Sequence, residues 1–313
     1  MLSALRAAQH AGVDIRPLDV WSRDADFDIL HVWGLEISQG LAVRWARKSG
    51  KRVVMTALLP YITIPHRLYY MLSSLCGTVK LRRELLRDVD ALVVVNDLQA
   101  EAAQHLLRVP QHLLHVIPNI VEPVFFQNSS EAIPRDWHCK SDYILCAGNI
   151  CARKNQVNLA QAALSLGCRL LVVGDVLAGE EAYGDALART IQGQDTVSWV
   201  PGVPSSSPEL VALYRNCVGF ALPSFKEQQP ISALEAAAVG KPLLLGDRPY
   251  ARQRYYRNAR LVDPASVASI KEGLRDILGR SQAHIPPAQF LSECTRNRVG
   301  EAYSNLYKAL AKA

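Results

Sequence analysis

The chain lacks the cysteine spacings and long apolar runs that mark several classes of protein. Its 313 residues contain no C-x2-C pair, and no apolar run approaches the ~20 residues of a membrane-spanning helix. The N-terminus has no signal-peptide core. We therefore expect a cytoplasmic protein whose cysteines are free buried thiols rather than disulfides or zinc ligands, namely Cys76, Cys139, Cys146, Cys151, Cys168, Cys217 and Cys294.

A strong excess of one charge is also missing. The formal net charge of +6 suits anionic ligands or a membrane surface but is too small to indicate nucleic acid. Basic residues cluster at 44–52 and 80–87. Such clusters are most often solvated faces, and the alternative is a surface for anionic lipid head groups, giving peripheral contact at the inner face of the membrane.

Metal-binding patterns are absent from the sequence as well. We identify no paired-acid loop of the metal-binding D-x-D type and no His or Cys ligand spacing, so we expect neither a metal nor a cofactor. The composition, 49% hydrophobic and 20% charged, is that of an ordinary globular protein, and the length is sufficient for two domains.

What the sequence does contain is centred on residues 218–245, which have the pattern strand, loop, helix, turn, strand. The apolar residues 218–222 have strand length. Pro230 suits the first turn of a helix because that position does not use its N–H group. Gly240 provides a residue for a left-handed helix end, and the apolar residues 243–245 begin a buried parallel strand.

Two carboxylates flank the predicted helix start. Glu227 lies in the loop beyond the carboxyl end of a strand, where open α/β sheets bind ligands, and Glu235 lies on the helix. The amides of Ile231 and Ser232 between them form an anion site. Two glutamates at this spacing are more often solvent-exposed. Together with the helix start they also suit a sugar nucleotide, whose phosphates would occupy the helix end.

The segment PSFKEQQPISALEAAAVGKPLLL, residues 223–245, resembles the signature of retaining nucleotide-sugar glycosyltransferases, especially glycosyltransferase family 4. A second segment, residues 148–155, is similar to that family's G-R-x4-K-(G/N) segment, which neutralises the donor pyrophosphate. Lys154 fits the Lys position, whereas Asn149 occupies the Arg position and Arg153 is a candidate replacement. The resemblance implies an α/β fold of two Rossmann-like domains facing across a cleft, called GT-B.

The resemblance also implies roles for single residues. Glu227 would contact and orient the donor sugar, Glu235 would hold the ribose, and Lys154 would stabilise the departing diphosphate. The acceptor hydroxyl would attack from the front face, assisted by the leaving phosphate. Further donor contacts are expected at Gly148, Asn149, Arg153, Val203, Gln228, Gln229, Pro230, Ile231 and Ser232.

The first domain departs from the family pattern. A helix is predicted at 2–10 and a strand at 13–20, but an opening strand with a Gly-rich turn is missing, so either the chain is truncated or the N-domain sheet lacks its usual first strand. The next strand resembles D-h-h-H-x-H, with Trp33 at the second His position. His31 is a candidate catalytic residue, although a histidine on an apolar strand is more often a core residue. His66, Arg67 and Tyr69 are candidate acceptor contacts, and a plain aromatic surface is an equal alternative for their loop.

We expect an acceptor-side domain at 1–135, a nucleotide-sugar domain at 136–285 and a C-terminal helix at 286–313 that returns to the first domain. The predicted function is sugar transfer from a nucleotide-diphosphate donor to a glycan, lipid-linked or small-molecule acceptor, in cell-surface polysaccharide or glycoconjugate synthesis. Two alternatives stay open: a catalytically silent binding or partner subunit on the same fold, and a sugar-nucleotide epimerase.

Overall fold

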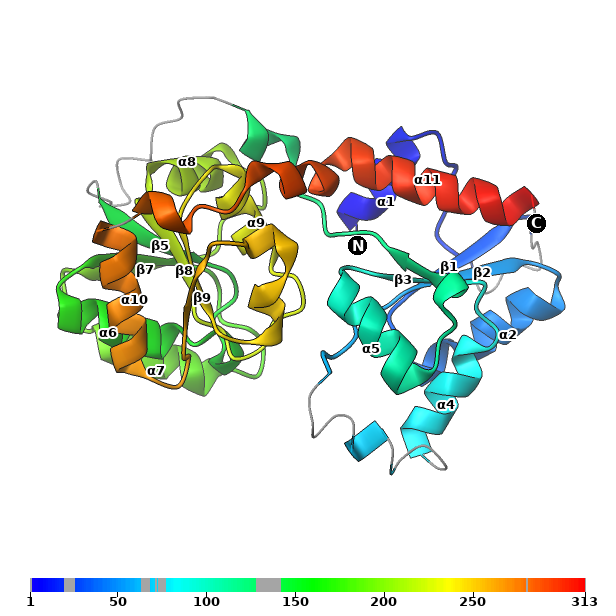
Figure 1. The fold of residues 1–313 in the computed structure, drawn as a ribbon, viewed down its shortest axis with the longest axis horizontal. Coiled ribbons are helices and arrows are strands. Elements are labelled where there is room, and N and C mark those ends of the chain that lie inside the picture. The colour runs from blue at the N-terminus through cyan, green and yellow to red at the C-terminus, as the bar shows by residue number, and fades with distance from the viewer. Residues whose placement is uncertain are drawn as a thin grey trace. The chain divides into compact units, whose positions relative to one another are not determined.

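The computed structural model describes residues 2–312 except 20–25, 63–67, 71, 73–76, 128–141 and 280. The chain divides into two compact units (Figure 1). Unit 1 comprises Met1–Ile120 and Glu293–Ala313, and unit 2 comprises Val121–Ser292. Each unit is built on a parallel sheet, which confirms the prediction of two α/β domains. The expected boundary at 135 and the candidate contacts His66 and Arg67 lie outside the described residues.

The sheet of unit 1 has four parallel strands that lie side by side in chain order. Because parallel crossovers are right-handed, connections that all step in one direction place their helices on one face. The elements are β1 (Ile29–Trp33), η1 (Ile37–Gln39), α2 (Gly40–Lys48), β2 (Arg52–Thr56), α4 (Gly77–Leu86), β3 (Ala91–Val94), α5 (Asp97–Leu107), η2 (Gln111–Leu113) and β4 (Leu114–Val116).

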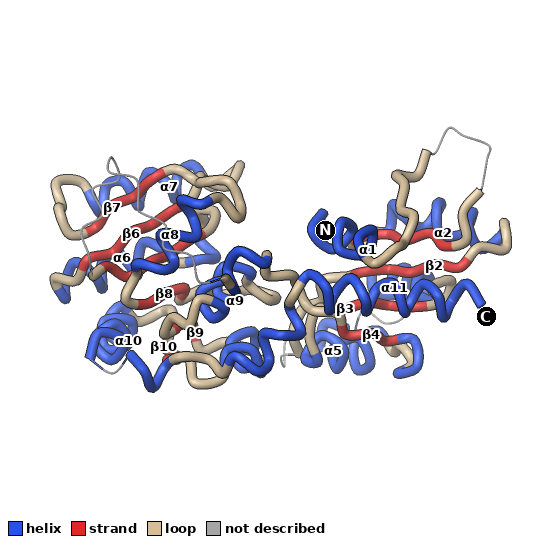
Figure 2. The backbone as a smooth tube through the Cα atoms, turned by 90° about the horizontal axis from the view of Figure 1, so that it is seen from above, coloured by secondary structure: helices blue, strands red, loops and turns tan. Residues whose placement is uncertain are grey.

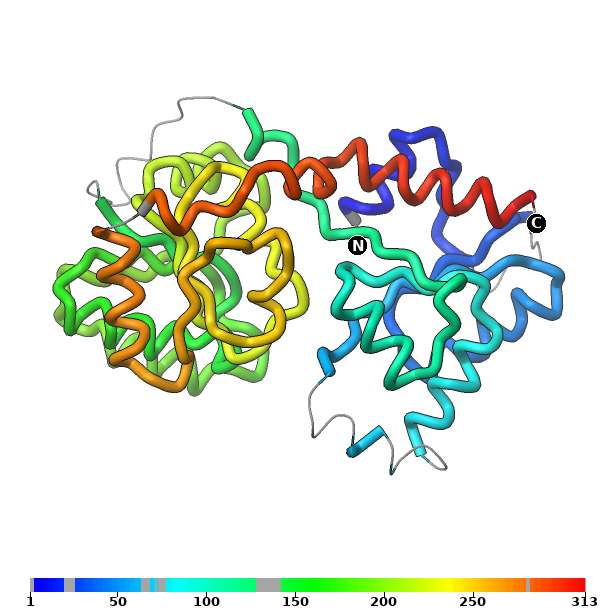
Figure 3. The backbone as a smooth tube through the Cα atoms, viewed as in Figure 1, coloured from blue at the N-terminus to red at the C-terminus, as the bar shows by residue number. Residues whose placement is uncertain are grey.

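The opposite face of this sheet is covered by helices from the two ends of the chain, α1 (Leu2–His10) and α11 (Arg296–Lys312). Figure 3 shows them side by side in blue and red. Since side chains alternate along a strand, Val53 and Met55 pack against α2, α4 and α5, whereas Val54 packs against α1 and α11. Residues almost 300 positions apart in the sequence therefore share one core.

The strand predicted at 13–20 is not formed in residues 13–19, the part that the structure describes. Val13 and Ile15 pack against the α1–α11 core without joining the sheet. Pro17 lies in the middle of the segment, and its nitrogen cannot donate to a strand ladder. The alternating apolar pattern therefore reflects packing of an irregular segment.

Unit 2 contains a six-stranded parallel sheet in the order β10-β9-β8-β5-β6-β7. The chain runs outward from β5 to β7, returns to β8 beside β5, and then runs outward to β10. The right-handed rule places α6 and α7 on one face and α8 and α9 on the other, and α10 packs beside α6 (Figure 2). The strands are β5 (Tyr143–Ala147), β6 (Arg169–Val173), β7 (Val197–Val200), β8 (Gly219–Leu222), β9 (Leu243–Gly246) and β10 (Arg260–Val262).

The helices of unit 2 follow the predicted order. They are α6 (Gln156–Leu166), α7 (Glu181–Ile191), α8 (Pro208–Asn216), α9 (Ile231–Ala238) and α10 (Val267–Gly279). Short 3-10 turns are η3 (Pro123–Phe126), η5 (Ala152–Lys154), η6 (Pro249–Arg252), η7 (Arg254–Tyr256), η8 (Ser281–His284) and η9 (Ala288–Cys294), the last of which extends across the boundary between the units.

Within the described residues, each helix is too short or too polar to cross a bilayer. The cysteines in this part of the chain are buried, namely Cys146, Cys151, Cys168, Cys217 and Cys294. Burial raises the pKa of the Cys146 thiol to about 12, so this thiol is inert at neutral pH.

The contact between α1 and α11 yields a stability test at Gly300. A Cβ atom there would lie 2.4 Å from the carbonyl oxygen of Ala7, so Gly300→Ala forces the two helices apart. We expect the unfolding free energy to fall by about 1–3 kcal/mol although alanine favours helices. The matched change Gly279→Ala, with open space around the new atom, should leave stability equal or higher. Urea unfolding followed by circular dichroism measures both, and equal midpoints would contradict the tight helix contact.

Candidate functional site

The strand order of unit 2 creates a position where ligands bind in open α/β sheets. The chain leaves β5 in one direction and β8 in the other, so the loops that follow these two neighbouring strands diverge. A crevice at such a switch point lies outside the carboxyl ends of the strands. The loop after β5 begins at Gly148, and the loop after β8 contains residues 223–230. These are the two segments for which the sequence predicted donor contacts.

An ion cluster joins the two loops. One carboxylate oxygen of Glu227 lies 2.7 Å from the Arg153 guanidinium and 3.0 Å from the Lys154 amine. The side chains of Glu227 and Lys154 are only 10% and 11% exposed, so water screens this pair weakly. The hydroxyl of Ser224 donates to the same oxygen at 3.4 Å. Two cations around one anion leave an excess positive charge at the switch point.

Backbone contacts hold the cluster in place. The amide of Phe225 donates to the carbonyl of Arg153, and the Arg153 guanidinium donates to the carbonyl of Lys226. Gly148 leaves space for the Lys154 side chain, because a Cβ atom at residue 148 would lie 3.0 Å from the Lys154 amine. Arg153 reaches the cluster from η5. A replacement for the cation missing at Asn149 would have to come from such a different position.

The start of α9 supplies hydrogen-bond donors near this cluster. The amides of Ala233 and Leu234 both donate to the carbonyl of Pro230. The amides of Ile231 and Ser232 have no partner among the described residues, as is normal for a helix start. Ile231 lies four positions after Glu227, which limits the distance between their Cα atoms to about 14 Å. The positive end of α9 and the two cations thus lie in one neighbourhood.

Residues that the sequence analysis passed over support the loop after β8. The Tyr250 hydroxyl donates to the carbonyl of Leu222 and accepts from the amide of Gly246. The Tyr256 hydroxyl donates to the carbonyl of Pro230, and the Gln253 side chain donates to that of Gln228. All three lie in the stretch 248–260, whose many arginines dominate its sequence pattern. The aromatic and amide residues within this polar stretch were the only sequence feature that could have indicated them.

The arginines of the same stretch contact acidic and aromatic side chains of the protein. Arg248 pairs with Asp263, Arg252 with Asp247 and Arg260 with Asp276. The Arg254 guanidinium lies over the Tyr255 ring and that of Arg257 over the Phe290 ring. These contacts hold the segment together.

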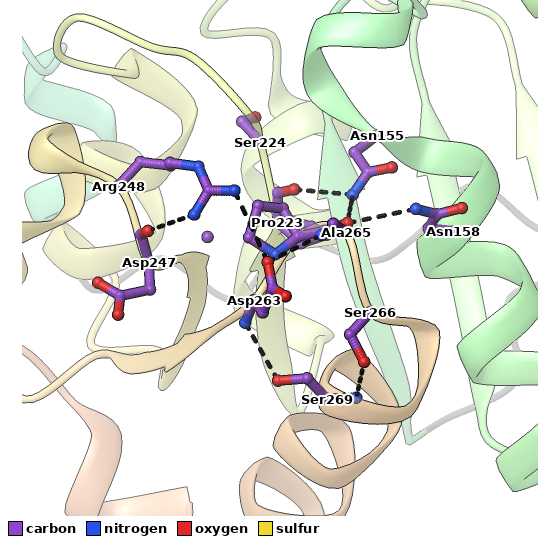
Figure 4. A network of polar contacts seen from close by, with 12 residues as sticks. Asn155, Asn158, Pro223, Ser224, Asp247, Arg248, Asp263, Ala265, Ser266 and Ser269 are labelled. Atoms are coloured by element: carbon purple, nitrogen blue, oxygen red, sulfur yellow. Dashed lines mark hydrogen bonds and ion pairs between the residues drawn. The ribbon is translucent and has the colours of Figure 1, made fainter.

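Figure 4 shows the polar contacts of Asn155, the residue that follows Lys154 of the ion cluster. Its side-chain amide donates to the carbonyl of Pro223 at 3.1 Å and to that of Pro264 at 2.7 Å. Asn158, one turn into α6, donates to the same Pro264 carbonyl at 3.2 Å. Asn155 is 3% exposed and has a φ angle of 67°, a left-handed conformation that asparagine tolerates. The residue after Lys154 therefore positions that lysine relative to β8 and β10.

Glu235 is buried on α9. Burial raises the pKa of its carboxyl to about 7, the Tyr214 hydroxyl beside it holds that pKa down in part, and the charge of Glu122 raises it further. The Tyr214 ring stacks on Phe220 and meets the Phe125 ring edge to face, which fixes that hydroxyl. Glu235 is thus a group whose charge changes near neutral pH, where a ligand that hydrogen-bonds to it would favour the ionised form.

Of the other predicted donor contacts, Asn149 and Gln229 lie in these two loops, whereas Val203 follows β7. Asn149 is exposed, and its carbonyl accepts a hydrogen bond from Gln156. Gln229 is buried, and its side chain donates to Gln253. Val203 is half-buried one residue after Gly202, whose amide donates to Asp175 at the end of β6.

His31, the remaining candidate, belongs to unit 1 and faces α11. Its Nδ1 lies 2.6 Å from the Tyr307 hydroxyl and its Nε2 lies 2.8 Å from the Thr56 hydroxyl. Its ring stacks on Trp33, and burial lowers its pKa to about 3. Both ring nitrogens thus have partners in the protein, and the imidazole is neutral. This is the environment of a structural histidine, the alternative that the sequence favoured.

Comparison with known proteins gives matches over both units. The model of the family "Glycosyl transferases group 1" matches residues 131–287, and that of "Glycosyltransferase Family 4" matches residues 5–125. A D-inositol 3-phosphate glycosyltransferase of Mycolicibacterium smegmatis is 27% identical over 216 residues, which are 66% of this chain and 49% of that protein. The chain thus spans about half the length of this curated relative.

Solved structures share the fold at low sequence identity. An apo structure of OtsA superposes with a TM-score of 0.72 at 14% identity, covering 99% of this chain and 76% of OtsA. Anabaena Alr3699/HepE in complex with UDP and glucose gives a TM-score of 0.68 at 15% identity, covering 99% and 81%. The lipopolysaccharide outer core galactosyltransferase WaaB gives 0.61 at 17%, covering 98% and 79%.

The double hydrogen bond of Asn155 can be tested by Asn155→Gly, which removes the side chain and keeps a residue that accepts a positive φ angle. Two buried carbonyls lose a donor, so the unfolding free energy should fall by about 1–3 kcal/mol. Asn158→Ala is the control, because it removes one longer bond at a half-buried site. Equal urea midpoints for the two variants would mean that Asn155 does not hold the strand ends.

The buried carboxyl of Glu235 predicts a pH-dependent stability. Its pKa is about 7 in the folded chain and 4.5 in its ordinary state, so the folded chain keeps a proton that the unfolded chain releases. The stability of the wild type should therefore fall between pH 4.5 and pH 7 relative to Glu235→Gln, which carries no charge. The difference in unfolding free energy should reach on the order of 3 kcal/mol above pH 7.

Urea unfolding across this pH range measures that difference. Glu209→Gln is the control, since backbone hydrogen bonds lower the pKa of this exposed carboxyl and the variant should not gain stability as the pH rises. A constant difference between Glu235→Gln and the wild type would show that folding does not shift the pKa of Glu235.

Proposed function

Because the chain belongs to the glycosyl transferases group 1 family, we propose that it transfers a sugar from a nucleoside-diphosphate donor to an acceptor hydroxyl, with retention of configuration. The observation that carries this proposal is the cluster of Glu227, Arg153 and Lys154 at the switch point of unit 2. The excess positive charge and the free amides of α9 suit the two phosphates of such a donor.

In the proposed mechanism the donor diphosphate takes the place of Glu227 as the main partner of Lys154 and Arg153. The bond between the sugar's anomeric carbon and the diphosphate oxygen breaks, and the electron pair goes to that oxygen. Lys154 and the α9 amides stabilise the developing negative charge in a site that water screens poorly. The acceptor oxygen attacks from the same face, and its proton passes to the departing phosphate. We propose that this step needs no metal.

The two carboxylates have different roles in this proposal. Glu227, released from its cations, accepts hydrogen bonds from hydroxyls of the donor sugar and so orients it. Glu235 accepts hydrogen bonds from the ribose hydroxyls, which favours its ionised form. His31 is assigned a supporting role, because its contacts to Tyr307 and Thr56 hold α11 on the sheet of unit 1.

The acceptor is proposed to be a glycan, a lipid-linked or a small-molecule hydroxyl, in cell-surface polysaccharide or glycoconjugate synthesis in the cytoplasm. Uridine diphosphate sugars are the first donors to test, since structures of the similar Anabaena protein contain UDP and UDP-glucose. A catalytically silent subunit on the same fold is the second candidate, because Asn149 and Trp33 stand where the resembled family carries Arg and His.

Donor binding can be tested by the thermal midpoint of the purified chain with UDP, GDP, dTDP and ADP sugars. A donor present at 100 times its dissociation constant stabilises a protein by about 2.7 kcal/mol, so one group of nucleotides should raise the midpoint clearly. Release of nucleoside diphosphate on addition of acceptor then separates an enzyme from a silent subunit. If every nucleotide sugar leaves the midpoint unchanged, the proposed function is wrong.

Substitutions at the ion cluster test the residue roles. Lys154→Ala should lower turnover by about 100- to 1000-fold, because it removes a cation from the developing negative charge. Lys226→Ala removes an exposed lysine of the facing loop and should keep wild-type turnover. Glu235→Ala should weaken donor affinity by roughly tenfold or more through the lost ribose contacts. Initial rates and donor titration calorimetry measure these effects, and wild-type values for Lys154→Ala and Glu235→Ala would contradict the assigned roles.

A further inference from the structure

One outer surface of unit 1 combines exposed apolar side chains with unpaired cations. Leu41 on α2 is 82% exposed, and Ile37 and Trp45, four residues before and after it, are 41% and 37% exposed. Residues four apart lie on the same side of a helix. Single exposed apolar residues are common, but three in one row over more than two turns are not.

Two basic residues lie within this row. At about 100° per residue, Arg44 and Lys48 fall in the same sector as Leu41 and Trp45, while the buried Val43 and Ala46 point to the opposite side. Arg44 and Lys48 are exposed, and neither pairs with another residue in the described part of the chain. We call Ile37, Leu41, Arg44, Trp45 and Lys48 the α2 surface. It contains no acidic residue.

The structure separates these two cations from the other members of the basic cluster at 44–52. Arg47 and Arg52 both pair with Asp90 at the edge of the sheet. The Lys51 amine lies over the Phe27 ring, which in turn contacts the Trp45 ring. Arg47, Lys51 and Arg52 thus have partners within unit 1. The unpaired charge of the cluster is that of Arg44 and Lys48, on the exposed side of α2.

We propose that the α2 surface binds an anionic lipid bilayer, with α2 lying in the plane of the head groups. Leu41 and Ile37 would enter the boundary of the acyl chains, and the Trp45 indole would lie at head-group depth. Arg44 and Lys48 extend beside them and keep their charges at the phosphates, as long basic side chains do at interfaces.

Charge complementarity selects a lipid surface over a second copy of the chain. In a symmetric dimer through this face, the α2 surface of one copy would face the α2 surface of the other, since such interfaces are self-complementary. Like charges would then be brought together without a partner. The neighbouring helix α4, which contacts η1, also exposes Leu81, while its Lys80 pairs with Glu84.

Vesicle sedimentation of the full-length chain tests this surface without using turnover. Vesicles of phosphatidylcholine and phosphatidylglycerol in equal parts should sediment the protein, vesicles of phosphatidylcholine alone should bind it far less, and added salt should release it. The tryptophan emission should shift to the blue on binding, and Trp45→Phe should remove most of that shift. An absence of sedimentation with the anionic vesicles would overturn the proposal.

Substitutions then locate the contact. Arg44→Glu with Lys48→Glu, and separately Leu41→Asp, should each weaken vesicle binding by about tenfold or more. Matched changes at exposed positions elsewhere are Arg275→Glu with Lys308→Glu and, for the apolar residue, Leu278→Asp. These controls should bind as the wild type does. Circular dichroism and thermal midpoints establish that each variant is folded.

Two further outcomes decide against the proposal. If the controls lose as much affinity as the α2 variants, binding depends on net charge rather than on this face. If the lipid-free wild type is a dimer by light scattering and Leu41→Asp makes it monomeric, the α2 surface is a contact between copies. Because these measurements involve neither donor nor acceptor, failure here leaves the proposed sugar transfer intact, and the reverse also holds.

Discussion

The site in unit 2 depends on one shared carboxylate. Glu227 lies in the loop after β8, whereas its partners Arg153 and Lys154 lie in the loop after β5, more than 70 positions earlier in the chain. Attraction between these groups is strong because the Glu227 and Lys154 side chains are nearly buried. The cluster therefore holds together two loops that the strand order directs apart. It also has one more cation than anion at the place where the proposed donor phosphates would bind.

The support around this cluster comes mostly from neutral groups. Asn155 anchors η5 to the carbonyls that end β8 and β10, while Tyr250 and Tyr256 hold the loop that leads into α9. A buried hydrogen bond fixes geometry without adding a charge that would compete with a ligand. Amide and phenol groups therefore hold the loops in place, and the cations are left for the proposed ligand.

Unit 1 follows from a different constraint, the direction in which its sheet is wound. Its four strands succeed one another in chain order, so their crossover helices all cover one face. The other face must be buried by helices that are not crossovers, and α1 and α11 from the two chain ends provide this cover. The polar contacts of His31 arise in the same layer, because alternate residues of β1 point toward α11.

Much of the element order could be predicted because it depends on local pattern. The helix predicted at 2–10 has the expected bounds, and the strand predicted to begin at residue 243 begins there. The strand expected at 13–20 failed because alternation alone does not distinguish a strand from an irregular segment packed on a core. Helix α4 is not predicted as a helix, because its sequence is dominated by basic residues. The buried Val79, Leu85 and Leu86 show its apolar side only in the structure.

By itself, the sequence determined the parallel-sheet class, the loop–helix–strand unit at 223–245 and the residue types of the site, because turn residues and hydrophobic period act over a few positions. Only the tertiary structure decided which side chains meet. The pairing of Glu227 with Arg153 and Lys154, the two carbonyls bound by Asn155, and the partners of His31 join residues from about 25 to more than 270 positions apart. Such contacts depend on strand order and helix placement, which no local pattern encodes.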